Sequence, residues 1–417
     1  MSEFQTSPGM RDIMAPESGR WRRFVEVFAD VVEPAGYDLI MPPLMEDMGV
    51  FERVGEATDV VSKEMYQFTD LGGRHVALRP EMTASVCRAF VQHRPTTPWK
   101  VWYSGPNFRY ERPQRGRYRQ FDQVGIEVFG VEDPYLDVEV IALAWRFYEA
   151  LGLRRVTLLL NSLGEPVDRA RYVDALRTYL ETNLDALTAE SRATLVRSPL
   201  RVLDSKRPPD AAVIATAPQL ADFLSTGAAE HFAAVRAGLD ALGVPYTVDP
   251  RLVRGLDYYR RTTFEFAGGT LEGAQNALGG GGRYDGLVEA LGGPPTAGIG
   301  FALGLDRTLL ACDDEGVFGA TERAVDVFVV DTTGGAEALV VTDEVRRAGH
   351  STDRAYDGRS MKAQMKAANR SGAAVAVIIG DDERAAGTAV VRPLRAGDAQ
   401  SVVPRADLLS HLEAVLT

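Results

Sequence analysis

The sequence predicts an α+β fold of two or three domains, and three observations lead to this prediction. Strand-like and helix-like segments follow one another irregularly over about the first 320 residues, apart from one helical stretch at about 166–243. After about residue 325, apolar strands alternate with amphipathic helices, which indicates a small α/β domain with a largely parallel sheet. The length of 417 residues also exceeds that of one typical domain.

The composition is that of an ordinary globular protein, with 45% hydrophobic and 25% charged residues. Cys87 and Cys312 lie far apart, and the five histidines are scattered, so neither a disulfide framework nor a metal site is expected. No signal peptide is visible, and no stretch approaches about 18 apolar residues. We therefore expect a cytoplasmic protein without a membrane partner.

The N-terminal part begins with a readable helix. Its apolar side chains recur at helical spacing, at Trp21, Phe24, Val25, Phe28 and Val32. Pro34 and Gly36 are expected to end this helix. The segment 39–43 is then predicted to form a short strand that its two prolines stop.

Arginines are concentrated in one segment of this acidic protein, whose net charge is −12. That charge alone weighs against nucleic-acid binding, although a total does not say where charges lie. Residues 109–119 contain five arginines in eleven positions, and Pro113 and Gly116 indicate a loop. Guanidinium groups bind phosphate through paired hydrogen bonds and keep their charge. The segment is either a phosphate-binding loop, for a nucleotide, RNA or both, or a solvated basic loop.

The residues around this loop, from 101 to 129, are predicted to form two strands. In the return strand, apolar residues at 124, 126 and 128 alternate with Gln123, Gly125 and Glu127. An amide and an acid that flank a glycine on one face either line a pocket or form a solvent-exposed polar face. Alternation alone leaves both interpretations open.

The middle of the chain changes from helices back to strands. Helical faces are predicted by Val173, Leu176 and Leu180, and later by Phe232, Val235, Leu239 and Leu242. A strand is expected at 258–266 and a glycine-rich turn at 279–282. Residues 299–301 then lead into a helix that is expected at about 303–310.

Two segments in this region are candidate ligand sites. Residues 253–259 place an arginine beside a glycine and two tyrosines, which fits either a ring-binding site or a strand edge with an ion pair. The glycine-rich run at 278–286 allows the backbone to approach a ligand closely, but tight turns use the same composition. It is neither a Walker A loop nor a Rossmann fingerprint, because the residues that follow and the surrounding elements differ.

The C-terminal region is predicted to contain strands at 325–330 and 375–379, with a helix ending near Ala348 and another at 361–370. On the second helix, Lys362, Lys366 and Arg370 share one face. This stripe faces either RNA or solvent.

Three segments together resemble the motifs of class II aminoacyl-tRNA synthetases. The helix and strand up to Pro43 resemble motif 1, residues 108–127 resemble motif 2, and Gly298–Arg307 resemble motif 3. Motif 1 implies a homodimer. The strings R-G-L-D-Y-Y at 254–259 and G-G-R-Y-D-G-L at 281–287 are similar to the two signature strings of the histidyl family, and residues 78–84 and 111–121 also match. Met82, Arg260 and Arg261 depart from the commoner residues of that family.

The resemblance, which covers nearly the whole chain, implies a domain plan and a reaction. We expect a class II catalytic domain with an antiparallel sheet at 1–320, a helical insertion at about 166–243, and an α/β anticodon-binding domain at 325–417. The implied activity is that of a histidine–tRNA ligase. Histidine and ATP give histidyl-adenylate, and the 3′ end of histidine tRNA then accepts the histidine. ATP with Mg²⁺, L-histidine and histidine tRNA are the implied ligands, with no protein-bound metal.

The resemblance also implies roles for individual residues. The α-ammonium of histidine is matched by Glu81, Thr83 and Gln123, and its imidazole pocket by Glu127, Tyr259 and Tyr284. Arg109 and Arg307 match the arginines on the α- and γ-phosphates of ATP, Glu111 the residue near the adenine amine, and Arg254 a catalytic arginine on the α-phosphate. Gln114 and Arg117 lie in the loop that is expected to reach the tRNA acceptor end.

Two alternatives are considered beside this interpretation. A regulatory relative of the synthetases, like the regulatory subunit of ATP phosphoribosyltransferase, should lack the anticodon-binding domain and lose catalytic arginines. This chain has Arg109, Arg254 and Arg307 and about 90 further residues at its C-terminus. A synthetase of the same subclass for another amino acid, such as threonine or proline, would differ in the two histidyl strings.

Overall fold

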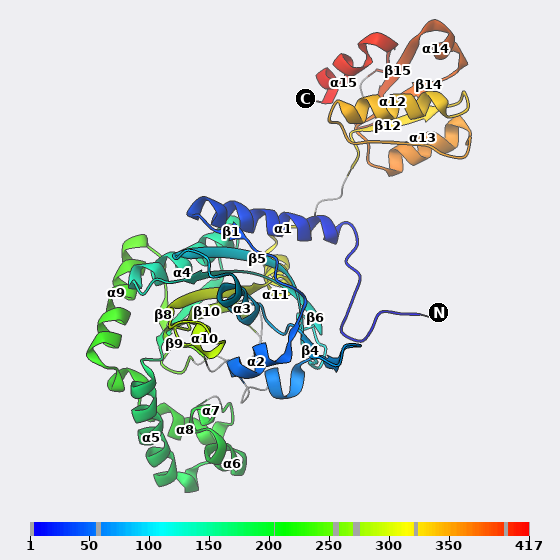
Figure 1. Cartoon of the computed structure of the whole chain (residues 1–417). Helices are drawn as coiled ribbons and strands as arrows, with labels where there is room; N and C mark the ends of the chain where they lie inside the picture. Colours follow the sequence, from blue (N-terminus) through cyan, green and yellow to red (C-terminus); the bar gives the residue numbers. More distant parts are fainter. Residues whose placement is uncertain are drawn as a thin grey trace. The chain divides into compact units, whose positions relative to one another are not determined.

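The computed structural model describes residues 4–55, 60–203, 205–252, 258–269, 276–320, 324–395 and 399–416. The chain divides into two compact units (Figure 1). The first contains the N-terminal segment up to Met14 and residues Arg20–Gly319, and the second contains Ala15–Gly19 and everything from Ala320 onward. Arg254, one of the predicted catalytic residues, lies outside the described residues.

A large sheet forms the centre of the first unit. Among the described residues it has eight strands, in the order β1 (Asp38–Leu39), β5 (Trp99–Phe108), β6 (Gln120–Phe129), β11 (Gly298–Gly304), β10 (Ala277–Arg283), β9 (Arg260–Gly268), β7 (Val156–Ser162) and β8 (Thr247–Val248). The pairs at the two ends of the sheet, β1–β5 and β7–β8, are parallel, and all other pairs are antiparallel. The predicted antiparallel catalytic sheet is therefore confirmed.

Helices with apolar faces pack on this sheet. They are α1 (Glu17–Val32), α4 (Pro134–Ala150), α9 (Thr226–Leu242) and α11 (Leu305–Glu315). The predicted face of α1 is correct, because Phe24, Phe28 and Val32 are fully buried. The ring of Phe28 packs edge-on against Phe147 of α4 and Phe301 of β11. Such aromatic pairs add to the stability that burial of apolar surface provides.

Shorter elements complete the first unit. A three-stranded sheet of β2 (Met45–Asp47), β4 (His75–Leu78) and β3 (Gln67–Thr69) lies near α2 (Met48–Gly55), α3 (Thr83–His93) and α10 (Leu287–Ala290). The helical stretch contains α5 (Pro166–Thr182), α6 (Ala189–Arg197), α7 (Pro199–Val202) and α8 (Ala211–Ala215), which gather at one end of the unit, away from the large sheet (Figure 1).

Two local predictions for the first unit are wrong. The strand expected at 39–43 is only the two-residue β1, since the prolines at 42 and 43 cannot donate to a ladder. The glycine-rich run 279–282, predicted to be a turn, lies inside strand β10. There the glycines allow close approach of neighbouring strands, because a β-carbon at Gly279 would lie 2.6 Å from the carbonyl oxygen of Ala302.

The second unit is a five-stranded sheet among the residues described. Its order is β13 (Thr352–Arg354), β12 (Val327–Asp331), β14 (Val375–Ile379), β15 (Thr388–Pro393) and β16 (Ser401–Pro404). The helices are α12 (Ala336–Arg347), α13 (Met361–Arg370), α14 (Asp381–Ala386) and α15 (Leu408–Leu416). The first three strands are parallel, as predicted, whereas β15 and β16 pair antiparallel. The predicted largely parallel sheet is therefore only half correct, because short connections at the C-terminal end favour antiparallel neighbours.

No helix in the described part of the chain combines the length and the apolar composition that a membrane span requires.

Candidate active site

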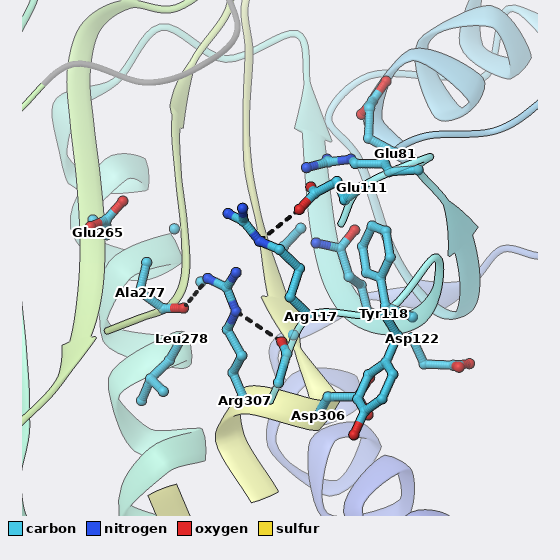
Figure 2. Close-up of a pocket in the computed structure, with 18 of the residues that line it drawn as sticks. Glu81, Glu111, Arg117, Tyr118, Asp122, Glu265, Ala277, Leu278, Asp306 and Arg307 are labelled. Atoms are coloured by element: carbon cyan, nitrogen blue, oxygen red, sulfur yellow. Dashed lines mark hydrogen bonds and ion pairs between the residues drawn. The ribbon is translucent and has the colours of Figure 1, made fainter. Parts of the chain in front are cut away.

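A cavity of about 400 Å³ opens on the large sheet (Figure 2). Its walls come from strands β6, β9, β10 and β11, from the start of α11, and from the arginine-dense loop. The predicted site residues that line it are Glu81, Thr83, Arg109, Glu111, Arg117, Gln123, Tyr259 and Arg307. These residues are far apart in the sequence, and the sheet brings them together.

Two arginines of the cavity are held by specific acceptors. Arg117 Nε lies 2.6 Å from Glu111 Oε2, so the predicted adenine-binding acid is also the ion-pair partner of this arginine. Arg307 donates from Nε to the carbonyl oxygen of Gly116 at 3.2 Å and from Nη1 to that of Ala277 at 3.0 Å. Figure 2 shows the guanidinium groups of Arg117 and Arg307 next to each other inside the cavity. Burial lowers the pKa of Arg307, and the nearby Arg117 lowers it further.

The third arginine of this group, Arg109, lies beside an aromatic wall. It donates to the carbonyl oxygen of Pro80 at 2.9 Å, and its guanidinium carbon lies 5.2 Å from the ring centroid of Phe121. Phe121 also lines the cavity. Fixed cations beside a flat ring suit a ligand that has both phosphates and a planar base.

A second cluster of polar groups lies behind the cavity wall, around the carboxyl group of Glu127. Its Oε1 accepts hydrogen bonds from Thr83 Oγ1 at 2.7 Å and Tyr103 Oη at 3.1 Å, and the Tyr284 hydroxyl donates to Oε2. Glu127 and Tyr284 are buried and do not themselves line the cavity, whereas Thr83 does. Burial raises the pKa of Glu127 to about 8, although the three hydroxyl donors oppose this shift.

Glycines make room for this cluster. Gly300 faces Glu127 across the β6–β11 pair, and a β-carbon at Gly300 would overlap Glu127 Oε2. In the same way, a β-carbon at Gly298 would overlap the Tyr284 ring. The glycines of the segment that resembles motif 3 therefore have a steric reason, because any larger residue displaces the groups around Glu127.

A buried ion pair anchors the strand end that carries Tyr284. The preceding residue, Arg283, is fully buried, and its Nη2 lies 2.7 Å from Asp137 Oδ1. Asp137 also accepts from Thr262 Oγ1 at 2.5 Å and lies 2.7 Å from His231 Nε2 on α9. A buried pair with this many partners is costly to break. It joins the helical stretch to the strand beside the site.

The three side chains that are predicted to accept an ammonium group all line the cavity. Glu81 is buried, and its Oε1 accepts from the backbone N–H of Ala84 at 2.9 Å, at the start of α3. Burial raises the pKa of Glu81. Gln123 Oε1 accepts from Asn107 Nδ2 at 2.8 Å, which fixes the amide on the cavity wall. The side-chain amide of Gln123 is thus held by a group that the sequence did not indicate.

Gln114 was predicted to be a site residue but is not among the residues that line the cavity. Conversely, several residues of the site were not predicted from the sequence. The missed ones include Tyr103, Asp122, Glu265 and Asp306, whereas Tyr258 lies in the candidate segment 253–259 but was given no role of its own. Tyr103 faces Gly125 in the β5–β6 register, so the alternation of residues 101 and 103 could have indicated it. The departure Met82 is buried at the start of α3 and is likewise not part of the cavity wall.

Comparison with known proteins decides which family has this site. The family model described as histidyl-tRNA synthetase matches residues 9–308, and the one described as anticodon binding domain matches residues 325–414. This chain belongs to the histidyl-tRNA synthetase family. It is 49% identical to a histidine–tRNA ligase of Corynebacterium urealyticum, over 98% of this chain and 96% of that protein. It is 48% identical to that of Rhodococcus erythropolis, over 96% of each.

Solved structures support the family assignment. The histidyl-tRNA synthetase of S. aureus, without ligands, has a TM-score of 0.83 and 34% identity, over 98% of this chain and all of that one. A protein of Bacillus halodurans described as an ATP phosphoribosyltransferase regulatory subunit/histidyl-tRNA synthetase has a TM-score of 0.67 at 20% identity, over 91% of this chain and 98% of that one. This second likeness shows the fold alone. The predicted combination of a class II catalytic domain with an anticodon-binding domain is confirmed.

Proposed function

We propose that this chain is a working histidine–tRNA ligase, which activates L-histidine with ATP and transfers it to the 3′ end of histidine tRNA. The observation that carries the proposal is the arrangement of the cavity. Fixed arginines, Arg109 and Arg307, lie on its wall together with Glu81 and Gln123, and the polar cluster of Glu127 lies directly behind Thr83. Membership in the histidyl-tRNA synthetase family and the match to an anticodon binding domain support it.

In this proposal, histidine lies between two sets of polar groups. Glu81, Thr83 and Gln123 accept its α-ammonium, and Glu127, Tyr259 and Tyr284 surround its imidazole. Discrimination follows because a side chain that cannot pair with these buried groups leaves part of their hydrogen-bonding capacity unused. Since Thr83 already bonds to Glu127, this threonine connects the two sets.

ATP takes the basic side of the cavity. Arg109 and Arg307 bind its α- and γ-phosphates, and Glu111 lies near the adenine amine. The carboxylate of histidine attacks the α-phosphorus, and pyrophosphate leaves. The attacking carboxylate is already ionised at neutral pH, so no general base is required. The fixed cations stabilise the negative charge that builds on the α-phosphate in the transition state.

Arg254 is proposed to be the third catalytic arginine, on the basis of the string that it begins. We expect Arg254→Ala to leave histidine affinity nearly unchanged but to slow adenylate formation by at least about 10²-fold, or about 2.7 kcal/mol of transition-state stabilisation. Single-turnover formation of histidyl-adenylate measures the rate, and equilibrium dialysis with histidine measures the affinity. An Arg254→Ala enzyme that activates histidine at the wild-type rate would show that this arginine is not catalytic.

Magnesium is proposed as a companion of ATP and not as a resident metal. Glu265 brings a carboxylate to the cavity wall. No group of three histidine, cysteine or carboxylate side chains that could hold a metal occurs in the described part of the chain. Mg²⁺ needs only one or two protein carboxylates when phosphates and water supply its other ligands. The residues present fit such an ion on the outer phosphates, where it would neutralise their charge.

The raised pKa of Glu127 gives a pH prediction. A carboxyl group that ionises near pH 4.5 in the unfolded chain and near pH 8 in the folded one keeps its proton in the native state between these values. Folded protein then binds more protons than unfolded protein, so stability falls as pH rises through this window. The slope approaches about 1.4 kcal/mol per pH unit for one proton.

Glu127→Gln removes this titration, while the amide still accepts hydrogen bonds. We expect the free energy of unfolding, measured by denaturant titration from pH 5 to 8, to decrease less steeply in Glu127→Gln than in the wild type. Other buried carboxyl groups of the site contribute equally to the pH dependence of the free energy of unfolding in both proteins. Equal slopes in the two proteins would mean that Glu127 is ionised throughout.

A homodimer is proposed from the segment that resembles motif 1. Large apolar side chains between residues 39 and 71 are exposed: Leu39, Met41, Leu44, Met45, Phe68 and Leu71. A concentration of exposed apolar residues is typical of an interface. The most exposed of those before Pro43 is Met41, at 82%.

We expect Met41→Asp to weaken self-association by at least about tenfold, because it places a charge in a desolvated contact. Sedimentation equilibrium would measure the dimer constant. Val196→Asp on α6 is the matched control, since Val196 is 77% exposed on a helix outside this segment. If the chain is monomeric before any substitution, the dimer proposal is wrong.

The tRNA is proposed to contact both units. Gln114 and Arg117 belong to the loop that would reach the acceptor end. In the second unit, Lys362, Lys366 and Arg370 of α13 are all exposed, so the predicted stripe can reach phosphates. The cytoplasm, where tRNA is used in translation, is the proposed compartment.

Histidine-dependent exchange of pyrophosphate into ATP tests the proposed function. Exchange that needs L-histidine and is followed by charging of histidine tRNA would support it. No exchange with any amino acid would favour a regulatory protein, although the match of residues 325–414 to an anticodon binding domain argues against one. Exchange with threonine or proline alone would favour another synthetase of the subclass.

A further inference from the structure

The segment before α1 touches both elements that carry the ATP-binding arginines. Arg11 Nη2 lies 2.5 Å from Asp306 Oδ1. Arg11 Nη1 lies 3.3 Å from the Tyr118 hydroxyl oxygen, and the guanidinium carbon lies 4.4 Å from the centroid of that ring. Asp306 directly precedes Arg307, and Tyr118 directly follows Arg117. One side chain thus joins the neighbours of two arginines that lie far apart in the sequence.

The backbone of the same segment is also attached to the loop. The carbonyl oxygen of Gly9 accepts the N–H of Arg119 at 2.8 Å. Gly9 has φ +79°, and a β-carbon there would lie 2.7 Å from Arg119 Cγ. Both the turn and the close approach require glycine at this position. The segment is therefore attached both by its backbone, at Gly9, and by the side chain of Arg11. The backbone attachment fixes the position from which the Arg11 side chain extends.

The positive charge of Arg11 also compensates nearby negative charge. Asp122 and Asp306 both line the cavity, and the cations near them include Arg79 and Arg11. Burial and, to a smaller extent, the nearby Asp306 raise the pKa of Asp122 to about 6, although Arg79 and Arg11 oppose this shift. Without Arg11, two carboxylates would face each other at low exposure with less compensation.

We propose that Arg11 is a positioning residue, which sets the separation of Arg117 and Arg307 around ATP by joining Tyr118 to Asp306. Arg11 does not line the cavity, so it acts through these two neighbours. The inference rests on the proposed function, and it extends that function in one respect, because it assigns Arg117, which lines the same cavity as Arg307, to ATP as well as to the loop that would reach the acceptor end. It assigns a role in ATP binding to a segment that none of the three class II motifs includes.

The test compares Arg11→Ala and Arg11→Lys with the wild type in histidine-dependent pyrophosphate exchange, with ATP and histidine varied separately. We expect Arg11→Ala to raise KM for ATP about five- to tenfold and to leave KM for histidine within about twofold. Arg11→Lys keeps the ion pair with Asp306 and should recover part of the loss. Arg22→Ala is the control, because Arg22 is 78% exposed and pairs only locally with Glu26 in the contacts described.

The outcomes separate this inference from the proposed function. If the wild type exchanges and Arg11→Ala has an unchanged KM for ATP, the positioning role is wrong and the function stands. If KM rises equally for ATP and histidine and the unfolding midpoint falls, Arg11 is merely structural and the inference is overturned. If the wild type shows no exchange with histidine, the proposed function fails, and this inference fails with it.

Discussion

Gly300→Ala is expected to reduce histidine-dependent pyrophosphate exchange by at least about 10²-fold, although it adds a single methyl group. The methyl carbon would overlap both Glu127 Oε2 and the backbone carbonyl oxygen of Ile126. Glu127 must then leave its position, and its hydrogen bonds to Thr83 and Tyr284 are lost. Overpacking of this kind costs about 1–3 kcal/mol before any lost contact to the substrate is counted.

The expected defect is specific to histidine. Since Gly300 lies on the Glu127 side of β11, we expect the apparent affinity for histidine to fall at least about tenfold, while KM for ATP changes less than about threefold. Gly227→Ala is the matched control, because nothing lies within 4 Å of its added β-carbon and its backbone conformation is unstrained. A Gly300→Ala enzyme with wild-type exchange would show that Glu127 has no part in histidine binding.

The steric requirement for glycine at position 300 could not be predicted from the sequence, whereas strand β6, which carries Glu127, could. Alternation from Gln123 to Val128 correctly indicated strand β6, and one of the two same-face residues, Gln123, lines the cavity. Glu127 instead lies behind the wall, because hydroxyl groups from α3, β5 and the turn after β10 surround it. Alternation reports which side of a strand a residue faces, but not which distant side chains cover that side.

Glycine composition was misleading for a related reason. Gly279–Gly282 was predicted to be a turn, since glycine is common in turns. In the structure these residues form β10, where the missing side chains let β9 and β11 approach. Helix faces were easier to predict. The span 361–370 of α13 and the buried face of α1 follow from local periodicity, which needs no knowledge of partners.

Contacts between distant segments were the hardest part to predict. Arg11, Tyr118 and Asp306 come from three separate regions, and nothing local in the sequence relates them. The composition of the arginine-dense loop indicated either a phosphate-binding loop or a solvated basic loop. Which of its arginines face the cavity depends on tertiary packing, and Arg109 and Arg117 are the ones that line it.

Arg307→Ala should have the largest effect on the ATP side of the reaction. Arg307 is a cation inside the cavity, and it also holds the carbonyl oxygens of Gly116 and Ala277. In the proposed function, its removal takes away a charge beside the phosphates of ATP, and it also loosens the loop that carries Arg117. Loss of one fixed donor to developing charge typically costs about 2.7–4 kcal/mol, so we expect kcat/KM for ATP to fall by about 10²- to 10³-fold.

A second variant, Arg307→Lys, separates the charge of this side chain from the geometry of its hydrogen bonds. Arg307→Lys keeps the charge, but a lysine ammonium cannot reproduce the planar fork that reaches two carbonyl oxygens and a phosphate together. We therefore expect Arg307→Lys to remain at least about tenfold below the wild type, with histidine affinity nearly unchanged in both variants. Arg347→Ala, at a side chain that is 79% exposed in the second unit, should behave as the wild type. Full recovery by lysine would reduce the role of Arg307 to that of a simple positive charge, because the geometry of its hydrogen bonds would then make no contribution to the rate.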